Sequence, residues 1–212
     1  AYAVSHAQDA VLEAMLARVQ KFDALELYSC FPVVPKMARR KLGLGPDVEP
    51  SVCGGLSFFG GPLNVYMAHA ACAMARAIRD GARTGLVYGQ GEFVTKHHAL
   101  ILAREPQEDA VLADARAQEK ADARRGPVPP TDETPDGAAT IETFTILHDP
   151  TGQPIQGVVI ARMGSGARTL ARIPAAHADD LAMLMSQDRY PIGARGQVRP
   201  GPDGLPEWRT SA

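Results

Sequence analysis

The chain has 212 residues, a mass of 22.6 kDa and 45% apolar residues, so it can bury a core in one large domain or two small ones. Its 22 basic and 24 acidic residues give a formal net charge of −2, which disfavours a general attraction to nucleic acid or to acidic membranes. No stretch reaches the roughly 18–20 apolar residues of a membrane span, and no basic-then-apolar leader opens the chain, so we expect a soluble cytoplasmic protein.

Residues 1–105 alternate helical and strand patterns, which predicts an α/β domain. A capping box, Ser5-x-x-Gln8, begins a helix with apolar residues on one face. A short strand pattern follows at residues 24–28. A basic helix then runs from residue 33 to residue 42 and ends at Gly43.

A glycine-rich segment, residues 53–62, leads into an alanine-rich helix at about residues 64–80. Small residues on every face of that helix let neighbouring backbones approach closely, so we expect it to be deeply buried. After it, residues 84–88 and 98–102 have the apolar pattern of two buried strands. The segment Gly89-Gln90-Gly91 is predicted to join them.

Residues 106–139 carry 4 basic and 8 acidic residues and separate two regions of different character. A charged helical pattern runs from Pro106 to Arg125. Prolines and acidic residues then follow one another too closely to form a core, so residues 126–137 are predicted to be an extended linker at a domain boundary.

Residues 140–212 have the pattern of a small all-β domain, a barrel or sandwich that resembles an OB-fold. Strand patterns occur at 140–147, 155–163, 167–173 and 193–198, with a short helix near 178–185. OB-folds often hold single-stranded nucleic acid in a basic groove with stacking aromatic rings. Because this region has 7 basic and 7 acidic residues and few aromatics, nucleic acid is disfavoured as a partner.

Two glycine-rich elements carry the strongest chemical signal. Gly60 and Gly61 precede a helix whose free N–H groups suit an anion or a developing oxyanion, and Asn64 either caps that helix or contacts a ligand. Gly89 and Gly91 let another group approach the backbone closely. On composition alone, tight packing of a small-residue helix against a sheet explains the same glycines.

Four motifs, taken in chain order, resemble the carboxyl-terminal half of the thiolase superfamily. They are Leu27-Tyr28-Ser29-Cys30-Phe31-Pro32, residues 54–64, residues 85–91 and Thr95-Lys96-His97-His98. The closest likeness is to thiolase-like acetyl-CoA acetyltransferases related to the sterol-carrier-protein thiolases. Some of these carry an additional C-terminal β-domain after a proline-rich linker, which residues 140–212 look like. The resemblance implies half of a layered αβα fold followed by that β-domain.

Thiolases take an acyl group from coenzyme A onto a cysteine and pass it to a second acyl-CoA, or run the reverse cleavage. The resemblance places that nucleophilic cysteine in an amino-terminal half, which we therefore expect to lie outside this chain or on another one. Because the chain lacks an initiator Met and opens abruptly on a helical pattern, Ala1 is not expected to be the natural start. Acyl-CoA would be a substrate, with no bound cofactor and no metal.

Three positions depart from the family pattern. Tyr28 stands where the family has Asn or His, and Gly61 stands where it has the histidine that helps bind the thioester oxyanion. The proton-moving cysteine of the family has no counterpart near Gly89 and Gly91. Losing one oxyanion donor can cost a factor of about 10²–10³ in rate, so a non-catalytic relative is an alternative to an active enzyme.

Tyr28, His97 and His98 are the candidates to replace these groups. The phenol of Tyr28 can donate to a thioester oxygen, and one histidine can supply acid–base or oxyanion chemistry. Strand alternation turns the two histidines to opposite faces, so at most one faces a site. A packed tyrosine ring and structural histidines are the alternatives.

Other reactive or charged groups have less specific explanations. Cys30 lacks an identifiable activating base and is predicted to be an inert buried thiol. Cys30, Cys53 and Cys72 are too far apart in sequence to indicate disulfides or a zinc site. Glu92 is predicted to be solvated. The basic residues Lys36 and Arg39-Arg40-Lys41 either meet the phosphates of coenzyme A or form a solvated helix face.

We therefore predict the C-terminal part of a thiolase-like acyl-CoA acyltransferase. The alternatives are a non-catalytic thiolase-like subunit that binds acyl-CoA, lipid or a partner, and an interaction module in which the β-domain docks another protein. The expected partners are acyl-CoA and the amino-terminal thiolase half, in a homo- or hetero-oligomer.

Overall fold

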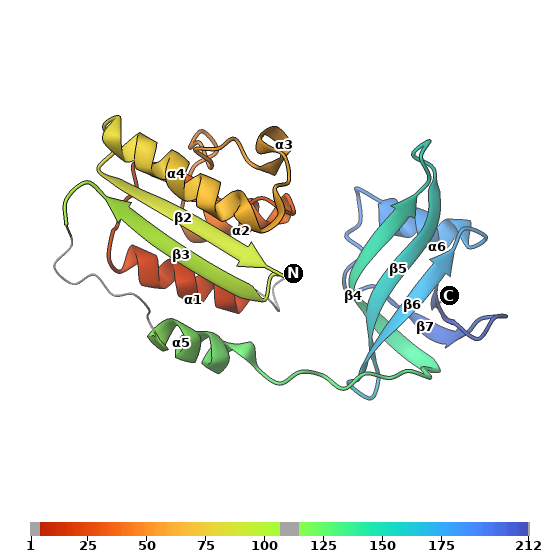
Figure 1. The fold of residues 1–212 in the computed structure, drawn as a ribbon. Helices are drawn as coiled ribbons and strands as arrows, with labels where there is room; N and C mark the ends of the chain where they lie inside the picture. The colour runs from red at the N-terminus through yellow and green to blue at the C-terminus, as the bar shows by residue number, and fades with distance from the viewer. Residues whose placement is uncertain (1–4, 107–114, 212) are drawn as a thin grey trace. The chain divides into compact units, whose positions relative to one another are not determined.

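The computed structural model describes residues 5–106 and 115–211, and the chain divides after Gly126 into two compact units (Figure 1). Each unit has its own apolar core. The first is an α/β unit and the second is a β-barrel, so the predicted fold class is confirmed. None of the described helices is both long enough and apolar enough to cross a membrane.

The sheet of the first unit has three strands in the order β1-β2-β3. β1 (Ala24–Leu27) and β2 (Thr84–Gly91) are parallel, and β3 (Lys96–Ala103) runs antiparallel to β2. Residues 25–27 of β1 and 85–89 of β2 are buried, as the apolar sequences of these strands predict.

Helices cover both faces of this sheet (Figure 1). α1 (Ser5–Leu16) and α2 (Val33–Lys41) share a core with Leu86 and Tyr88 of β2, and α4 (Tyr66–Arg79) shares a core with Val87. Two short helical turns, α3 (Leu56–Phe59) and η2 (Leu63–Val65), lie in the segment before α4. α5 (Ala115–Arg125) packs against α1.

Two burial predictions for this unit were wrong. α4 buries only one face, through Tyr66, Ala70 and Met74, because the sheet covers one side and its opposite face is exposed in this chain. β3 is an edge strand with alternating exposure, and Leu100 is 57% exposed. Gly89-Gln90-Gly91 belongs to β2, and the turn to β3 lies at residues 92–95.

The predicted capping role of Gln8 was also wrong. Its side chain is fully buried, and Nε2 donates to the carbonyl oxygen of Val34 at 3.3 Å and to Oη of Tyr88 at 2.9 Å. The amide is therefore used to join α1 to α2 and to the sheet rather than to cap its own helix.

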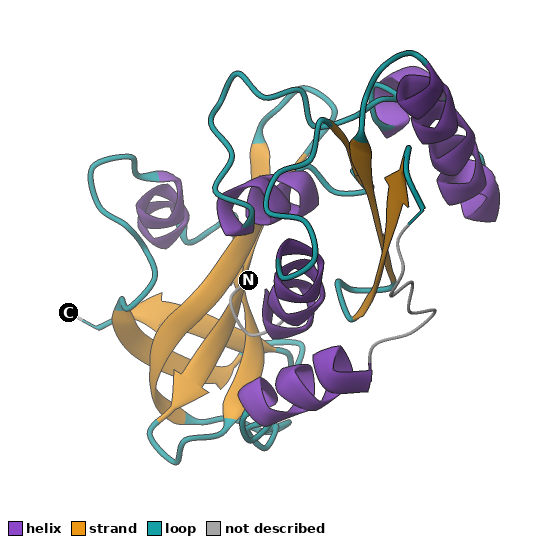
Figure 2. Cartoon of the chain, turned by 90° about the vertical axis from the view of Figure 1, so that its left-hand side faces the viewer, coloured by secondary structure: helices purple, strands orange, loops and turns teal. Residues whose placement is uncertain are grey.

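The second unit is a closed five-stranded barrel in the order β4-β5-β6-β8-β7 (Figure 2). A short helix, α6 (Ala178–Met185), connects β6 to β7 and packs Leu181 and Leu184 into the barrel core beside Trp208. The strands are β4 (Gly137–His148), β5 (Pro154–Met163), β6 (Arg168–Pro174), β7 (Arg195–Pro200) and β8 (Pro206–Thr210). The last of them was missing from the prediction.

Part of the predicted linker is fixed to the barrel. The amide of Arg168 donates to the carbonyl oxygen of Pro130, and the amide of Asp132 donates to that of Arg168, both at 2.8 Å. Residues 130–132 thus continue the sheet beside the first residue of β6. Of the charged helical pattern, α5 covers 115–125, and residues 107–114 lie outside the described residues.

Candidate functional site

The predicted site residues lie at one end of the first unit. Because β1 and β2 are parallel, their carboxyl ends point the same way, and the amino end of α4 lies at that end too (Figure 1). Tyr28 follows β1, and Gly89 and Gly91 end β2. Gly60, Gly61 and Asn64 precede α4, and His97 and His98 begin β3.

Tyr28 is half-buried with its ring against that of Tyr66, at a centroid distance of 5.5 Å and an angle of 59°. Burial raises the pKa of Tyr28, with a smaller contribution from Cys30. The phenol therefore stays protonated near neutral pH and keeps an O–H group that can donate a hydrogen bond to a thioester oxygen.

His97 is held by two structural hydrogen bonds. Nε2 lies 3.0 Å from the carbonyl oxygen of Val94 and Nδ1 lies 2.8 Å from Oη of Tyr88. A carbonyl oxygen only accepts, so Nε2 carries the proton and Nδ1 accepts from the tyrosine. Burial lowers the pKa of His97, which favours this neutral form. Acid–base work by His97 would require breaking one of these bonds.

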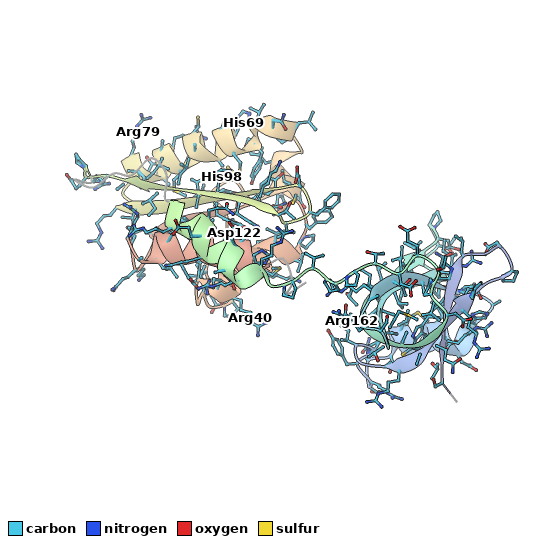
Figure 3. The ribbon with its side chains drawn as sticks, turned by 90° about the horizontal axis from the view of Figure 1, so that it is seen from below. Arg40, His69, Arg79, His98, Asp122 and Arg162 are labelled. Carbon is cyan, nitrogen blue, oxygen red and sulfur yellow. The ribbon has the colours of Figure 1, made fainter. Side chains whose placement is uncertain are left out.

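His98 lies on the opposite face of β3, as strand alternation predicts. It pairs with Gly89 while His97 pairs with Gln90, and its side chain is exposed. Figure 3 shows His98 on the sheet and His69 on α4. His98 is therefore the histidine of this pair that a ligand can reach.

The glycines of β2 have a packing explanation in part. A Cβ atom on Gly89 would lie 3.2 Å from Cε of Met67 of α4, which is tighter than an ordinary contact, so a side chain there would require the methionine to move. Gly91 has no such neighbour, since its nearest contact would be Cβ of Lys96 at 3.8 Å. Of these two glycines, packing against α4 explains Gly89 but not Gly91.

The segment before α4 is open and carries unusual backbone conformations. Gly60 has φ +76°, and nothing lies within 4 Å of a Cβ built on Gly60 or Gly61. Asn64 is exposed and does not cap α4, whose N-cap residue is Val65 without a side-chain bond. Among the described residues, the non-glycine residues with positive φ are Leu63, Glu92 and Val94, all at this end of the unit.

A fully buried carboxylate was missed by the sequence reasoning. Glu26 of β1 accepts from Ser51 Oγ at 2.7 Å, from Tyr66 Oη at 2.7 Å and from the amide of Cys53 at 3.1 Å. The sequence does contain a signal for this group, because an acidic residue inside an otherwise apolar strand indicates a buried carboxyl group.

The thiol of Cys53 is not an activated nucleophile. Burial, together with Glu26, raises the pKa of Cys53 to about 11, so its thiol is protonated at neutral pH. Cys30 is partly buried and its Sγ accepts from the amide Nε2 of Gln90. Among the residues that the structure describes, no cluster of His, Cys, Asp or Glu could hold a metal ion.

Large apolar side chains are exposed around this end. Phe58 is 88% exposed, Leu63 87% and Phe93 85%. The full set is Phe31, Val33, Phe58, Phe59, Leu63, Val65 and Phe93, which we call the apolar rim. So large a group of exposed apolar side chains is typical of a surface that contacts a ligand or another protein segment.

Two of the basic residues predicted to meet phosphates are used by the fold. Arg39 donates to the carbonyl oxygen of Gly45, and Lys41 forms an ion pair with Glu13 at 2.5 Å. A groove of about 540 Å³ lies at the opposite end of the sheet, lined by residues that include Lys21, Asp23 and Arg83. It is therefore separate from the candidate site.

The comparisons with known proteins concern both units. Residues 118–204 match the family model of the thiolase-like protein type 1 additional C-terminal domain. A solved structure, a monomeric SCP2-thiolase like protein type 1 from Mycobacterium smegmatis, is 32% identical with a TM-score of 0.74. The match covers 91% of this chain and 42% of that one, so this chain spans less than half of the length of that relative. No curated protein matches the sequence.

Proposed function

Because the chain is thiolase-like and carries the additional C-terminal domain of the type 1 thiolase-like proteins, we propose that it is the C-terminal part of an acyl-CoA acyltransferase. The reaction would be thioester acyl transfer or Claisen-type carbon–carbon chemistry. The nucleophilic cysteine would come from an amino-terminal half, and acyl-CoA would be the substrate.

The apolar rim carries this proposal. An α/β unit that was complete by itself would bury most of these side chains, and their position at the carboxyl ends of β1 and β2 coincides with the glycine-rich segments. A second half seated there would cover the rim and enclose an acyl group between the two halves. The exposed face of α4 supports the same arrangement.

Within such a site, the residues of this chain would bind and polarise the thioester. The Tyr28 phenol is a neutral donor, which stabilises negative charge on an oxygen without supplying a nucleophile. His97 contributes to the packing beneath the site rather than to proton transfer, because both of its ring nitrogens are occupied.

The test uses the longer protein that contains this chain, with acetyl-CoA and a longer acyl-CoA as probes. We expect release of free coenzyme A and formation of a new acyl product. Tyr28→Phe should lower kcat about 10-fold to 100-fold with KM little changed, because a donor to the oxyanion is lost. Tyr190→Phe, on the exposed surface of the barrel, is the matched control. Absence of turnover in the parent protein contradicts the proposal.

A non-catalytic acyl-CoA or lipid-binding subunit is the second candidate. It is favoured by Gly61 at the position of the oxyanion-binding histidine of the family and by the occupied nitrogens of His97. Thermal shift of the longer protein with acyl-CoA separates the two: stabilisation without turnover supports the subunit, and stabilisation with turnover supports the enzyme.

Assembly is a separate proposal. We predicted a homo- or hetero-oligomer, whereas the solved relative is described as monomeric. A single polypeptide that holds both halves would complete the site without a partner copy. Light scattering of the longer protein distinguishes these cases, and the cytoplasmic location stays a prediction.

A further inference from the structure

The buried carboxylate of Glu26 binds both the start of the glycine-rich segment and the first residue of α4, which lie on either side of Tyr28. On one side is residue 51, which lies antiparallel to Glu26 across the outer edge of β1. Ser51 Oγ donates to Oε2 of Glu26 and accepts from the amide of Gly55 at 2.9 Å. The carboxylate therefore fixes the start of the glycine-rich segment through a side chain and through the amide of Cys53.

On the other side is the first residue of α4. Tyr66 is buried and donates from Oη to Oε1 of Glu26, and its ring packs against those of Tyr28 and Phe59. Each carboxylate oxygen thus accepts hydrogen bonds from a different side of Tyr28. Oε2 holds the glycine-rich segment, and Oε1 holds the aromatic contact of Tyr28.

Fold stability alone does not require an ionisable group at this position. Among the described residues, no ion pair with Glu26 is present, and its carboxyl oxygens accept hydrogen bonds from Ser51, Cys53 and Tyr66. Burying a carboxyl group is costly even when it is hydrogen-bonded, and a well-packed apolar side chain is often at least as stable. A buried polar group that is not needed for stability calls for another explanation, and holding neighbouring groups in a fixed geometry is one.

We propose that Glu26 is a positioning residue of the candidate site: its carboxylate holds the glycine-rich segment and the Tyr66 phenol in one arrangement beside Tyr28. The assignment of this arrangement to acyl binding rests on the proposed function. The arrangement itself can be tested without activity.

The alkylation rate of Cys53 measures whether the glycine-rich segment keeps its contact with Glu26. Burial and Glu26 together hold the pKa of its thiol at about 11, so alkylation at pH 8 is slow in the parent chain. Glu26→Gln should raise the alkylation rate of Cys53 about fivefold or more relative to exposed Cys72, because the negative charge beside the thiol is gone. Peptide mass spectrometry gives both rates in one sample, and the rate at Cys30 shows whether the unit has unfolded.

Amide resonances give a second measurement. Glu26→Gln should shift the amides of Gly54 and Gly55, whereas Glu142→Gln, which removes a partly buried carboxylate bound by two arginines in the barrel, should leave them in place. Tyr66→Phe keeps the carboxylate and removes one donor, so it should shift the Tyr28 ring even if Glu26→Gln does not fold.

A folded Glu26→Gln chain with the Cys53-to-Cys72 rate ratio within twofold of the parent and unshifted glycine amides would overturn the proposal. So would an unshifted Tyr28 ring in Tyr66→Phe. In the longer protein, Glu26→Gln should lower kcat about 10-fold and change KM less than about threefold. A parent protein without acyl transfer contradicts the proposed function, while the thiol and amide measurements still decide the positioning role.

Discussion

At the scale of single residues, glycines set the distance between β2 and α4. A Cβ atom on Gly85 would lie 2.1 Å from Sδ of Met74 and 2.8 Å from its Cγ. Gly85→Ala should therefore lower the free energy of unfolding by about 1–3 kcal/mol, because the methionine or the helix must move. Gly91→Ala, where the new atom would make only an ordinary contact with Cβ of Lys96 at 3.8 Å, is the control and should cost under about 0.5 kcal/mol. Equal losses in urea unfolding would show that the helix yields without strain.

His97 gives a pH-dependent prediction. Burial lowers its pKa in the folded chain, so the unfolded chain takes up a proton at a higher pH than the folded chain does. Stability should therefore fall as the pH drops below the ordinary histidine value of about 6.5 and through the lower folded pKa. His97→Gln should remove this part of the slope between about pH 7 and pH 5.

The control for this titration is His148→Gln, at an exposed position of the barrel. Urea unfolding of both variants at each pH checks the prediction. If His97→Gln and the parent lose stability in parallel, protonation of His97 is not what destabilises the chain.

The limits of sequence-based prediction are clearest for residues whose partners are distant in the chain. The elements that hold Tyr28, Gly60 and His98 could be predicted from local patterns. The partners of Gln8 and Glu26 could not, because they lie 80 and 40 residues away at Tyr88 and Tyr66. Local patterns favour a helix cap for Gln8, and tertiary packing overrides them.

At the scale of elements, a single carboxylate joins three helices. Glu13 of α1 pairs with Lys41 of α2 at 2.5 Å and with Arg124 of α5 at 2.8 Å. Hydrogen bonds from both cations hold the pKa of Glu13 at about 2, below its ordinary 4.5. α5 thus lies against the first unit, although the match to the additional C-terminal domain begins at residue 118 within it.

Acid should release α5. The ion pairs stabilise the docked helix above about pH 4.5, and this contribution is lost as the pH falls toward 2 and Glu13 is protonated. Because the group is partly exposed, we expect only about 1 kcal/mol. Glu13→Gln should make residues 115–126 more susceptible to protease at pH 7, whereas Glu119→Gln, exposed on α5, should not. Equal cleavage in the two variants would contradict this role.

Element prediction succeeded where periodicity was long and failed at edges. The helix at 178–185 follows from apolar residues at helical spacing, and most strands of the barrel follow from period-2 alternation. β8 has only five residues, and its buried residues Glu207 and Trp208 are adjacent rather than alternating, so no period-2 pattern marks it. β3 has a strand pattern, but its sequence does not tell that it lies at the edge of the sheet.

At the scale of the whole molecule, the two units differ in completeness. The barrel closes on itself around Trp208, with its edges paired, whereas the α/β unit exposes the apolar rim and one face of α4. Exposed apolar groups of this size are typical of a surface that contacts another protein segment or a ligand. Composition alone gives no sign of this contrast, because the rim residues look like ordinary core residues in the sequence.

The fragment of residues 127–212 should therefore fold alone. It contains every strand of the barrel and residues 130–132, which pair with the start of β6. We expect a cooperative thermal transition by circular dichroism at the temperature where the barrel melts in the whole chain. A fragment that begins at residue 137 keeps the barrel strands and loses the pairing at Arg168, so its transition temperature should fall by several degrees.

The fragment that ends at residue 126 should associate through the apolar rim, and Phe58→Ser together with Phe93→Ser should reduce that association in light scattering. If that fragment without these substitutions is monomeric in light scattering, the apolar rim does not need a second half to cover it.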